Sequence, residues 1–249
     1  MTNIQPKYCI DDIYNKINKT LTEDIHSIPH ETKKILEKCF NEGEQGQLIL
    51  LNILILRRLT NEHELIILDG LLFDYLMKSN INNIKEKLYY SFPNGIVPLK
   101  SSLKMNYEIL QKLLIEKNFK EADKLTQKYL CSLAGLNENN KRQWLYFTDI
   151  SLIPAEDLYT IDLLWQMYSQ GKFGFSIQRK IWIFNNYNWN KLWQQIGWIH
   201  KGVMRRYPQE FIWTINAPTG HLPLFNQLRG NQVLASLFEH IAWKNNKKS

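Results

Sequence analysis

This sequence is poor in cysteine and has no long apolar run. Its 249 residues include three cysteines, Cys9, Cys39 and Cys131, at wide spacing. An odd number at such spacing gives no disulfide framework and favours a reducing compartment. The longest apolar run, Leu48 to Leu56, is interrupted by Asn52 and falls far short of the ~20 residues that cross a bilayer. We therefore expect no membrane-spanning helix.

The N-terminal segment lacks the features of a targeting sequence. Residues 1–20 have neither an apolar core nor the Arg- and Ser-rich, acid-poor character of an import sequence. We expect a protein that works in the compartment where it is made, or one that has already lost a presequence.

Positive charge and tryptophan gather in the second part of the chain. Residues 1–100 carry 12 basic and 13 acidic side chains, whereas residues 101–249 carry 19 and 11, and all eight tryptophans lie between Trp144 and Trp243. This combination favours a flat anionic partner, either nucleic acid or an aromatic ligand with carboxylates. The alternative is that the tryptophans form the core and the lysines solvate the surface.

Helical periodicity predicts an all-α fold with two domains. Residues 1–90 read as an antiparallel helical bundle, with the apolar helix at 47–59 in its centre. Two prolines and a glycine in residues 91–100 mark a boundary, so we assign a linker at 91–103. An all-helical core domain follows at 104–243, with one of its helices expected at 119–133. The Asn- and Lys-rich residues 244–249 are expected to be a disordered tail.

Within the core domain, the segment SQGKFGFSIQ (169–178) predicts a tight corner between two helices. Gly171 ends the first helix, Ser176 is expected to cap the second, and Phe173 and Phe175 are expected to fix the corner to the core. Residues 197–229 show no periodicity, and a long irregular stretch in a compact domain is usually functional or mobile.

Catalytic and metal-binding patterns are weak throughout. His26 and His30, with Cys9 and Cys39, match no known zinc spacing. The Gly171-Lys172 pair has neither the upstream glycine nor the following Ser or Thr of a phosphate loop, and no strand precedes it as in a dinucleotide fold. No catalytic constellation stands out from the residues themselves.

Residues 107–240 closely resemble the genomes-uncoupled tetrapyrrole-binding family, the porphyrin-binding activators of magnesium chelatase in cyanobacteria and plastids. The motifs that carry the resemblance stand in uninterrupted order: Cys131-x-Leu-Ala-Gly135, Arg142-Gln-Trp-Leu145, Ile153-Pro-x-x-Asp-Leu158, Gly171-Lys-Phe-Gly-Phe-Ser-Ile-Gln178, Ile196-Gly-Trp198 and Ala217-Pro-Thr-Gly-His-Leu-Pro223. The resemblance implies a core shaped like a cupped hand, in which an apolar palm between residues 136–149 and 198–229 holds the ligand.

The resemblance also implies a protein that is not an enzyme and has no cofactor of its own, and it implies the ligands and the partner. The ligands would be protoporphyrin IX and magnesium protoporphyrin IX, and the partner would be the large porphyrin-binding subunit of magnesium chelatase. The expected location is the plastid stroma, for a plastid-encoded protein, or the cyanobacterial cytoplasm. We expect a monomer that binds no nucleic acid, and we leave peripheral association with plastid membranes open.

Seven residues are the candidates for porphyrin contact. They combine flat rings with groups that can meet a propionate: Phe147, Tyr207, Phe211, Trp213, Asn226, Arg229 and Arg142. By the resemblance, Phe147 is a palm aromatic and Arg229 meets a propionate. Arginine suits that role because its fork binds a carboxylate bidentately. Gln127 stands where some family members have a cation, which puts affinity in doubt.

Three further readings stay open on the sequence alone. A nucleic-acid-binding module would use the basic aromatic region, and its binding would fall steeply with salt. A helical scaffold would use the leucine-rich N-terminal bundle to dock a protein. His200 and His221 could ligate a porphyrin metal, although each is more readily explained as a loop histidine bonded to backbone.

Overall fold

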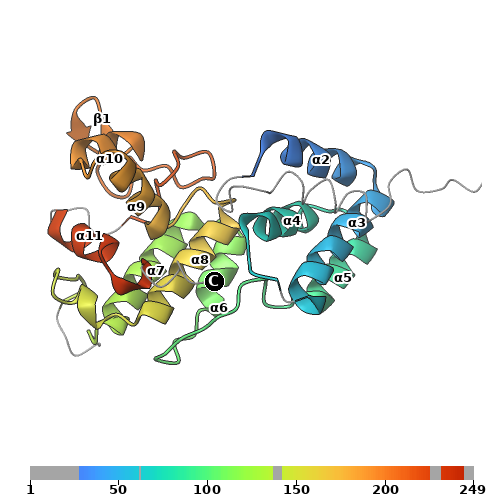
Figure 1. The fold of residues 1–249 in the computed structure, drawn as a ribbon, viewed down its shortest axis with the longest axis horizontal. Helices are drawn as coiled ribbons and strands as arrows, with labels where there is room; N and C mark the ends of the chain where they lie inside the picture. Colours follow the sequence, from blue (N-terminus) through green and yellow to red (C-terminus); the bar gives the residue numbers. More distant parts are fainter. Residues whose placement is uncertain (1–27, 62, 137–141, 225–230, 244–249) are drawn as a thin grey trace, which may run out of the picture. The chain divides into compact units, whose positions relative to one another are not determined.

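The computed structural model describes residues 28–61, 63–136, 142–224 and 231–243 (Figure 1). These residues form two compact units, one up to Ile96 and one from Val97 onward. The described residues contain ten α-helices, three short π or 3-10 turns and a single pair of two-residue strands, so the predicted all-α class is confirmed. None of the described helices is both long and apolar enough to span a membrane. The predicted tail at 244–249 lies outside the described residues.

The first unit is built around one apolar helix. Its helices are α2 (His30–Asn41), α3 (Glu44–Ile55), α4 (Ile67–Met77) and α5 (Asn82–Ser91), with a π-helical turn at Leu56–Thr60. The central helix α3 contacts the other three, and its Leu50, Leu51 and Leu54 have no exposed surface. The helix therefore has apolar contacts on several sides, as its leucine-rich sequence predicts.

A buried ion pair joins the end of α3 to the start of α4. Arg57 Nε donates to Asp69 Oδ1 at 2.6 Å, and the other carboxylate oxygen accepts from the Ile66 N–H at 3.0 Å. Asp69 is fully buried and Arg57 is 7% exposed. Removal of either partner would leave the other charge buried and unpaired, so the pair fixes this connection.

The second unit contains the remaining helices. They are α6 (Glu108–Ile115), α7 (Phe119–Leu133), α8 (Ala155–Tyr168), α9 (Phe175–Phe184), α10 (Trp189–Gln195) and α11 (Asn231–Phe238). Strands β1 (Ile199–His200) and β2 (Val203–Met204) pair antiparallel after α10. Helices α6, α7 and α8 pack together, with Trp165 of α8 fully buried (Figure 1). Residues 100–102, which the sequence assigns to a linker, are hydrogen-bonded to α8.

The predicted corner at 169–178 is present, but its helix cap differs from the prediction. The Gly171 N–H bonds the Gln166 carbonyl at 2.8 Å and closes α8. Gly174, with φ +135°, is the cap residue of α9, and a Cβ there would lie 2.7 Å from the Asp162 carboxylate. Ser176 does not cap the helix. Instead, its N–H donates to Asp162 Oδ1 at 2.9 Å, so the buried Asp162 takes the capping role.

Phe173 and Phe175 are both fully buried, as predicted. The Phe173 ring lies edge-on to Phe119 with centroids 5.3 Å apart, and it also contacts Trp165 at 6.4 Å. The corner is therefore attached to the helices α7 and α8 through aromatic packing.

The corner holds the loop at 217–223 through hydrogen bonds, and we call this set the clasp. Gln178 Nε2 donates to the carbonyls of Gly220 and Pro223 at 3.0 and 2.8 Å. The Gly174 N–H donates to the Leu222 carbonyl at 3.0 Å, and the Gly220 N–H donates to the Lys172 carbonyl at 2.7 Å. Two motifs of the family resemblance, at 171–178 and 217–223, are thus hydrogen-bonded directly to each other.

Asp123 of α7 holds the residue that follows the clasp. Its Oδ1 accepts the Leu224 N–H at 2.6 Å. Burial raises the pKa of Asp123 to about 8, although the bond from Leu224 favours the charged form. The carboxyl group therefore keeps its proton at neutral pH, and it can still accept the Leu224 N–H through its carbonyl oxygen.

The clasp predicts a large effect of a conservative substitution. Gln178→Met would leave the Gly220 and Pro223 carbonyls buried without their donor, which should cost about 2–4 kcal/mol of unfolding free energy. Because every tryptophan lies in the second unit, urea unfolding followed by tryptophan fluorescence reports on this unit. The exposed Gln194→Met is the matched control, and equal stability of the two variants would contradict the role of the clasp.

The raised pKa of Asp123 predicts that the unfolding free energy decreases as the pH rises. The unfolded carboxyl loses its proton near its ordinary pKa of 3.8, whereas the folded one keeps it until about pH 8. The folded state binds more protons than the unfolded state between these pKa values. Asp123 therefore makes its largest contribution to the unfolding free energy below pH 4, and this contribution falls as the pH rises to 8. Asp123→Asn should therefore remove a decline in unfolding free energy between pH 5 and 8, measured by urea titration. Parallel profiles for the two proteins would rule out this assignment.

Candidate functional site

One side of α7 connects the two segments between which the palm is expected. Lys124, Gln127 and Cys131 are spaced i, i+3 and i+7, so they share one side of the helix, which we call the α7 strip. Gln127 Nε2 donates to Cys131 Sγ at 3.6 Å. At a rise of 1.5 Å per residue, the two ends of the strip are roughly 10 Å apart. This length is comparable with the width of a tetrapyrrole macrocycle.

An aromatic cluster stands at the Lys124 end of the strip. The rings of Tyr207 and Trp213 meet edge to face with centroids 5.9 Å apart, and Trp213 Nε1 donates to the Pro208 carbonyl at 2.9 Å. Phe211 packs behind Trp213 and is only 5% exposed, whereas Tyr207 is 41% exposed. Three predicted residues are thus brought together, with Tyr207 as the accessible ring.

Tyr207 lies within electrostatic range of α7. Burial raises the pKa of the Tyr207 phenol, the Asp123 and Glu121 carboxyl groups raise it further, and the Lys124 ammonium lowers it. These interactions place the phenol beside the first turns of α7. At neutral pH the Tyr207 hydroxyl is therefore protonated and able to donate a hydrogen bond.

Arg142 and Asp149 form a bidentate pair at the other end of the strip. Arg142 Nη1 lies 2.7 Å from Asp149 Oδ2, and Nη2 lies 3.3 Å from Oδ1. Both groups act electrostatically on the Cys131 thiol of α7, which places them at this end. Partial burial of Asp149 opposes its ionisation, but the bonds from Arg142 and the Tyr146 N–H lower its pKa. The pair therefore stays charged at neutral pH.

The Arg142 guanidinium also stacks on an aromatic ring. It lies 4.5 Å from the centroid of the Tyr146 ring, and Tyr146 is 51% exposed. Because Asp149 already engages its fork, Arg142 shapes the loop and presents Tyr146 as a flat surface. The predicted contact of Arg142 with a propionate would require it to leave Asp149.

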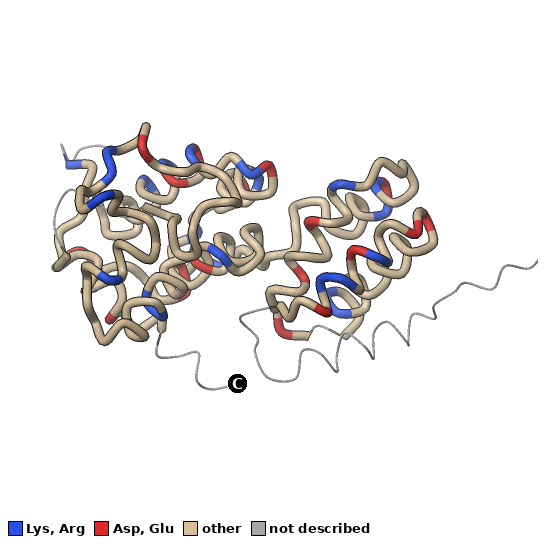
Figure 2. The backbone as a smooth tube through the Cα atoms, turned by 90° about the horizontal axis from the view of Figure 1, so that it is seen from above, with Lys and Arg blue, Asp and Glu red and all other residues tan. Residues whose placement is uncertain are grey.

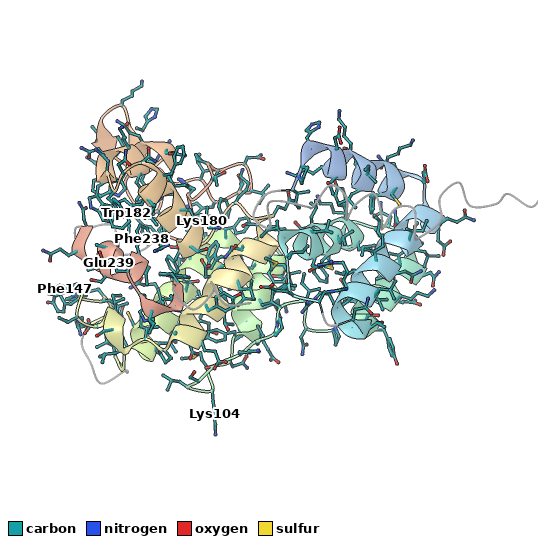
Figure 3. The ribbon with its side chains drawn as sticks, viewed as in Figure 1. Lys104, Phe147, Lys180, Trp182, Phe238 and Glu239 are labelled. Carbon is teal, nitrogen blue, oxygen red and sulfur yellow. The ribbon has the colours of Figure 1, made fainter. Side chains whose placement is uncertain are left out.

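Phe147 lines a shallow groove beside α11. The ring is 51% exposed, and the groove has a volume of about 330 Å³. Its other lining residues are Ile150, Ser151, Ser236, Glu239, His240 and Ile241. Figure 3 shows Phe147 and Glu239 at the same edge of the second unit. An exposed ring next to a carboxylate suits apolar contact with a ligand better than recognition of an anion.

Two predicted contacts, Asn226 and Arg229, lie outside the described residues. So do His26 and Cys9 of the weak zinc pattern, and residues 137–141 of the first palm segment. Cys39, from the same pattern, is buried, and its Sγ donates to the Gly46 carbonyl at 3.3 Å. Across the part of the chain that the structure describes, no group of three His, Cys, Asp or Glu side chains is arranged to hold a metal ion.

The two loop histidines differ in their surroundings. His221 is fully buried, with Nδ1 2.7 Å from the Ile196 carbonyl and Nε2 3.1 Å from the Ile212 N–H. Both ring nitrogens are therefore occupied, and burial lowers the pKa of His221, which keeps the ring neutral. This arrangement leaves no nitrogen for a porphyrin metal. His200 is exposed on β1.

Sequence reasoning missed Lys124 and Glu239. A charged residue on an amphipathic helix usually indicates a solvated face, and nothing in the pattern sets Lys124 apart from Lys120 or Lys128. The spacing of Lys124 with Gln127 and Cys131 was the available signal, because it puts them on one side of a helix that was correctly predicted.

The site geometry can be compared with known proteins. The GUN4-like family model matches residues 100–241, more than half of the chain. The protein ycf53 of Porphyra purpurea is 52% identical over 177 residues, which are 71% of this chain and 74% of the relative. The Ycf53-like protein of Synechocystis is 42% identical over 201 residues, 81% of this chain and 85% of the relative. The chloroplastic tetrapyrrole-binding protein of Arabidopsis thaliana is 35% identical over 146 residues, 55% of each chain.

Solved structures give the same result. GUN4 from Chlamydomonas reinhardtii is 39% identical with a TM-score of 0.54, over 59% of this chain and 96% of that one. Ligand-free GUN4 from Arabidopsis thaliana is 34% identical with a TM-score of 0.50, over 58% of this chain and 98% of that one. The resemblance in the sequence motifs is therefore confirmed, and this chain belongs to the GUN4-like family.

Proposed function

We propose that this protein binds protoporphyrin IX and magnesium protoporphyrin IX on the α7 strip. The observation that carries the proposal is the pair of exposed flat rings, Tyr207 and Tyr146, at opposite ends of a strip of macrocycle length. Membership of the GUN4-like family supports it, as does the name of the Arabidopsis relative, a tetrapyrrole-binding protein.

The physical chemistry fits a carrier that releases its ligand. A porphyrin has an apolar disc and two propionates on one edge, so it needs aromatic walls and a cation at the rim. Burial of about 300 Å² of disc would contribute about 7 kcal/mol before the costs of association, which leaves an affinity on the order of micromolar. Such affinity allows transfer of the porphyrin to another protein.

In this proposal the protein is an accessory factor and not a catalyst. It presents porphyrin to the large porphyrin-binding subunit of magnesium chelatase and so stimulates magnesium insertion in chlorophyll synthesis. The relatives from Porphyra, Synechocystis and the Arabidopsis chloroplast support a plastid or cyanobacterial location. Among the described residues of the second unit, Lys and Arg alternate along the backbone with acidic and neutral residues (Figure 2), which does not favour the nucleic-acid alternative.

Porphyrin binding predicts quenching of tryptophan fluorescence. Deuteroporphyrin IX titrated into the full chain should quench at micromolar ligand. Phe147→Ala and Arg229→Ala should each weaken binding about 5- to 10-fold, the effect of losing one apolar wall or one contact with a carboxylate. Tyr90→Ala is the aromatic control, since Tyr90 is 90% exposed on α5 of the first unit. Circular dichroism should show unchanged helicity. Absence of quenching at tens of micromolar ligand would sink the proposal.

The proposed stimulation of magnesium chelatase predicts an effect on the rate of magnesium insertion that follows porphyrin binding. The rate of magnesium insertion by the assembled chelatase should rise when the full chain is added, and Phe147→Ala should need more protein for half of the maximal stimulation because it loads less porphyrin. Tyr90→Ala should behave as wild type. If Phe147→Ala bound porphyrin more weakly but stimulated the chelatase as well as wild type does, stimulation would not depend on presentation of porphyrin.

A further inference from the structure

The described cations of the site differ in their freedom to meet a carboxylate. Arg142 is held on both arms of its fork by Asp149, in a pair whose side chains are 23% and 14% exposed. The Arg205 guanidinium donates to the Glu210 carbonyl, and the main-chain N–H of Arg206 donates to the Glu210 carboxylate, so the loop that carries these two arginines also carries an acid of its own. The α7 strip itself carries one cation among its three members, Lys124.

We propose that Lys124, with the Tyr207 hydroxyl, is a carboxylate-binding site at one end of the α7 strip, and that the ligand carboxylate replaces Glu121 as the partner of Lys124. This inference rests on the proposed function and identifies the end of the strip that receives a propionate.

The Lys124 contact with Glu121 is suited to exchange. Lys124 Nζ lies 2.7 Å from Glu121 Oε1, one turn earlier on the helix, and the side chains are 49% and 48% exposed. The hydrogen bond to Glu121 raises the pKa of Lys124, so the ammonium is charged at any physiological pH. Exposed pairs of this kind contribute little to stability, so an incoming carboxylate can replace Glu121 without a large penalty.

Tyr207 supplies the second donor. The Lys124 ammonium lowers the pKa of the Tyr207 phenol, and the ring of Tyr207 meets Trp213 edge to face with centroids 5.9 Å apart, which holds it in place. A carboxylate that accepts from an ammonium and a phenolic O–H makes one charge-assisted and one neutral hydrogen bond. The exposed edge of the Tyr207 ring remains available to the macrocycle.

The surrounding acids leave this end of the strip open to an anion. Asp123 lies beneath it, but its buried carboxyl is protonated at neutral pH and adds no negative charge. Glu121 is the acid that competes for Lys124, and in the proposed exchange the ligand carboxylate takes its place. At the opposite end, Asp149 neutralises Arg142, and Glu239 lies beside Phe147. The propionate edge of a porphyrin should therefore point toward Lys124 and its apolar edge toward Tyr146 and Phe147.

The experiment compares two porphyrins on matched charge variants. Deuteroporphyrin IX and its dimethyl ester have the same macrocycle, but only the first carries carboxylates. Lys124→Gln should weaken binding of the diacid about 3- to 5-fold and leave binding of the ester unchanged, because one exposed charge contact is lost. Glu121→Gln should tighten diacid binding about 2-fold, because the competing carboxylate is gone.

Lys104→Gln is the control for the loss of one positive charge, since Lys104 lies on the loop before α6, away from Phe147 (Figure 3). It should match wild type for both ligands. Equal diacid affinity in wild type and Lys124→Gln would overturn the inference, as would an equal loss for diacid and ester. If Glu121→Gln left the affinity for the diacid unchanged or weakened it, the proposed replacement of Glu121 by the ligand carboxylate would be wrong. If wild type bound neither porphyrin, the proposed function itself would fail.

Discussion

The clasp between the helical corner and the loop at 217–223 is the interaction on which the second unit depends. Gln178 uses one amide group to bond the carbonyls of Gly220 and Pro223, and backbone bonds on either side complete the contact. The clasp fixes the end of the long irregular loop, and this loop carries Tyr207 and Trp213. The aromatic end of the α7 strip therefore has its position set by a contact that is itself remote from the strip.

Buried polar groups extend this constraint in two directions. His221 uses both ring nitrogens to join the end of α10 to residue 212, and Asp123 ties Leu224 to α7. Each group satisfies backbone atoms that would otherwise be buried without a partner, which is costly in a protein interior. The motif residues that most clearly indicate the family thus fix the course of the loop backbone. The residues suited to contact a ligand lie elsewhere.

The sequence predicts the helices well because their apolar faces repeat with helical period. The expected helix at 119–133 has the same bounds in the structure, and Phe173 and Phe175 are buried as expected. The cap by Ser176 was wrong because Asp162, fourteen residues earlier, accepts the bond from its N–H, and such a contact leaves no local pattern. For the site, Tyr207 and Trp213 were both named as candidates, and their rings are in contact in the structure. The pairing of Arg142 with Asp149 and the position of Lys124 depend on how α7 meets the loops, which spacing alone does not give.

The acceptors of the clasp are all main-chain carbonyls. Gln178 therefore recognises the course of the loop and not the identity of its side chains. Gly220 is also restricted in its side chain, because its φ is +79° and a Cβ would lie 2.8 Å from Ile181 and Ile196. Thr219 is the exposed position among residues 217–223, whereas Ala217 and the residues from Gly220 to Pro223 are buried. The clasp therefore limits changes of surface chemistry in this loop to its tip and keeps the rest of its path constant.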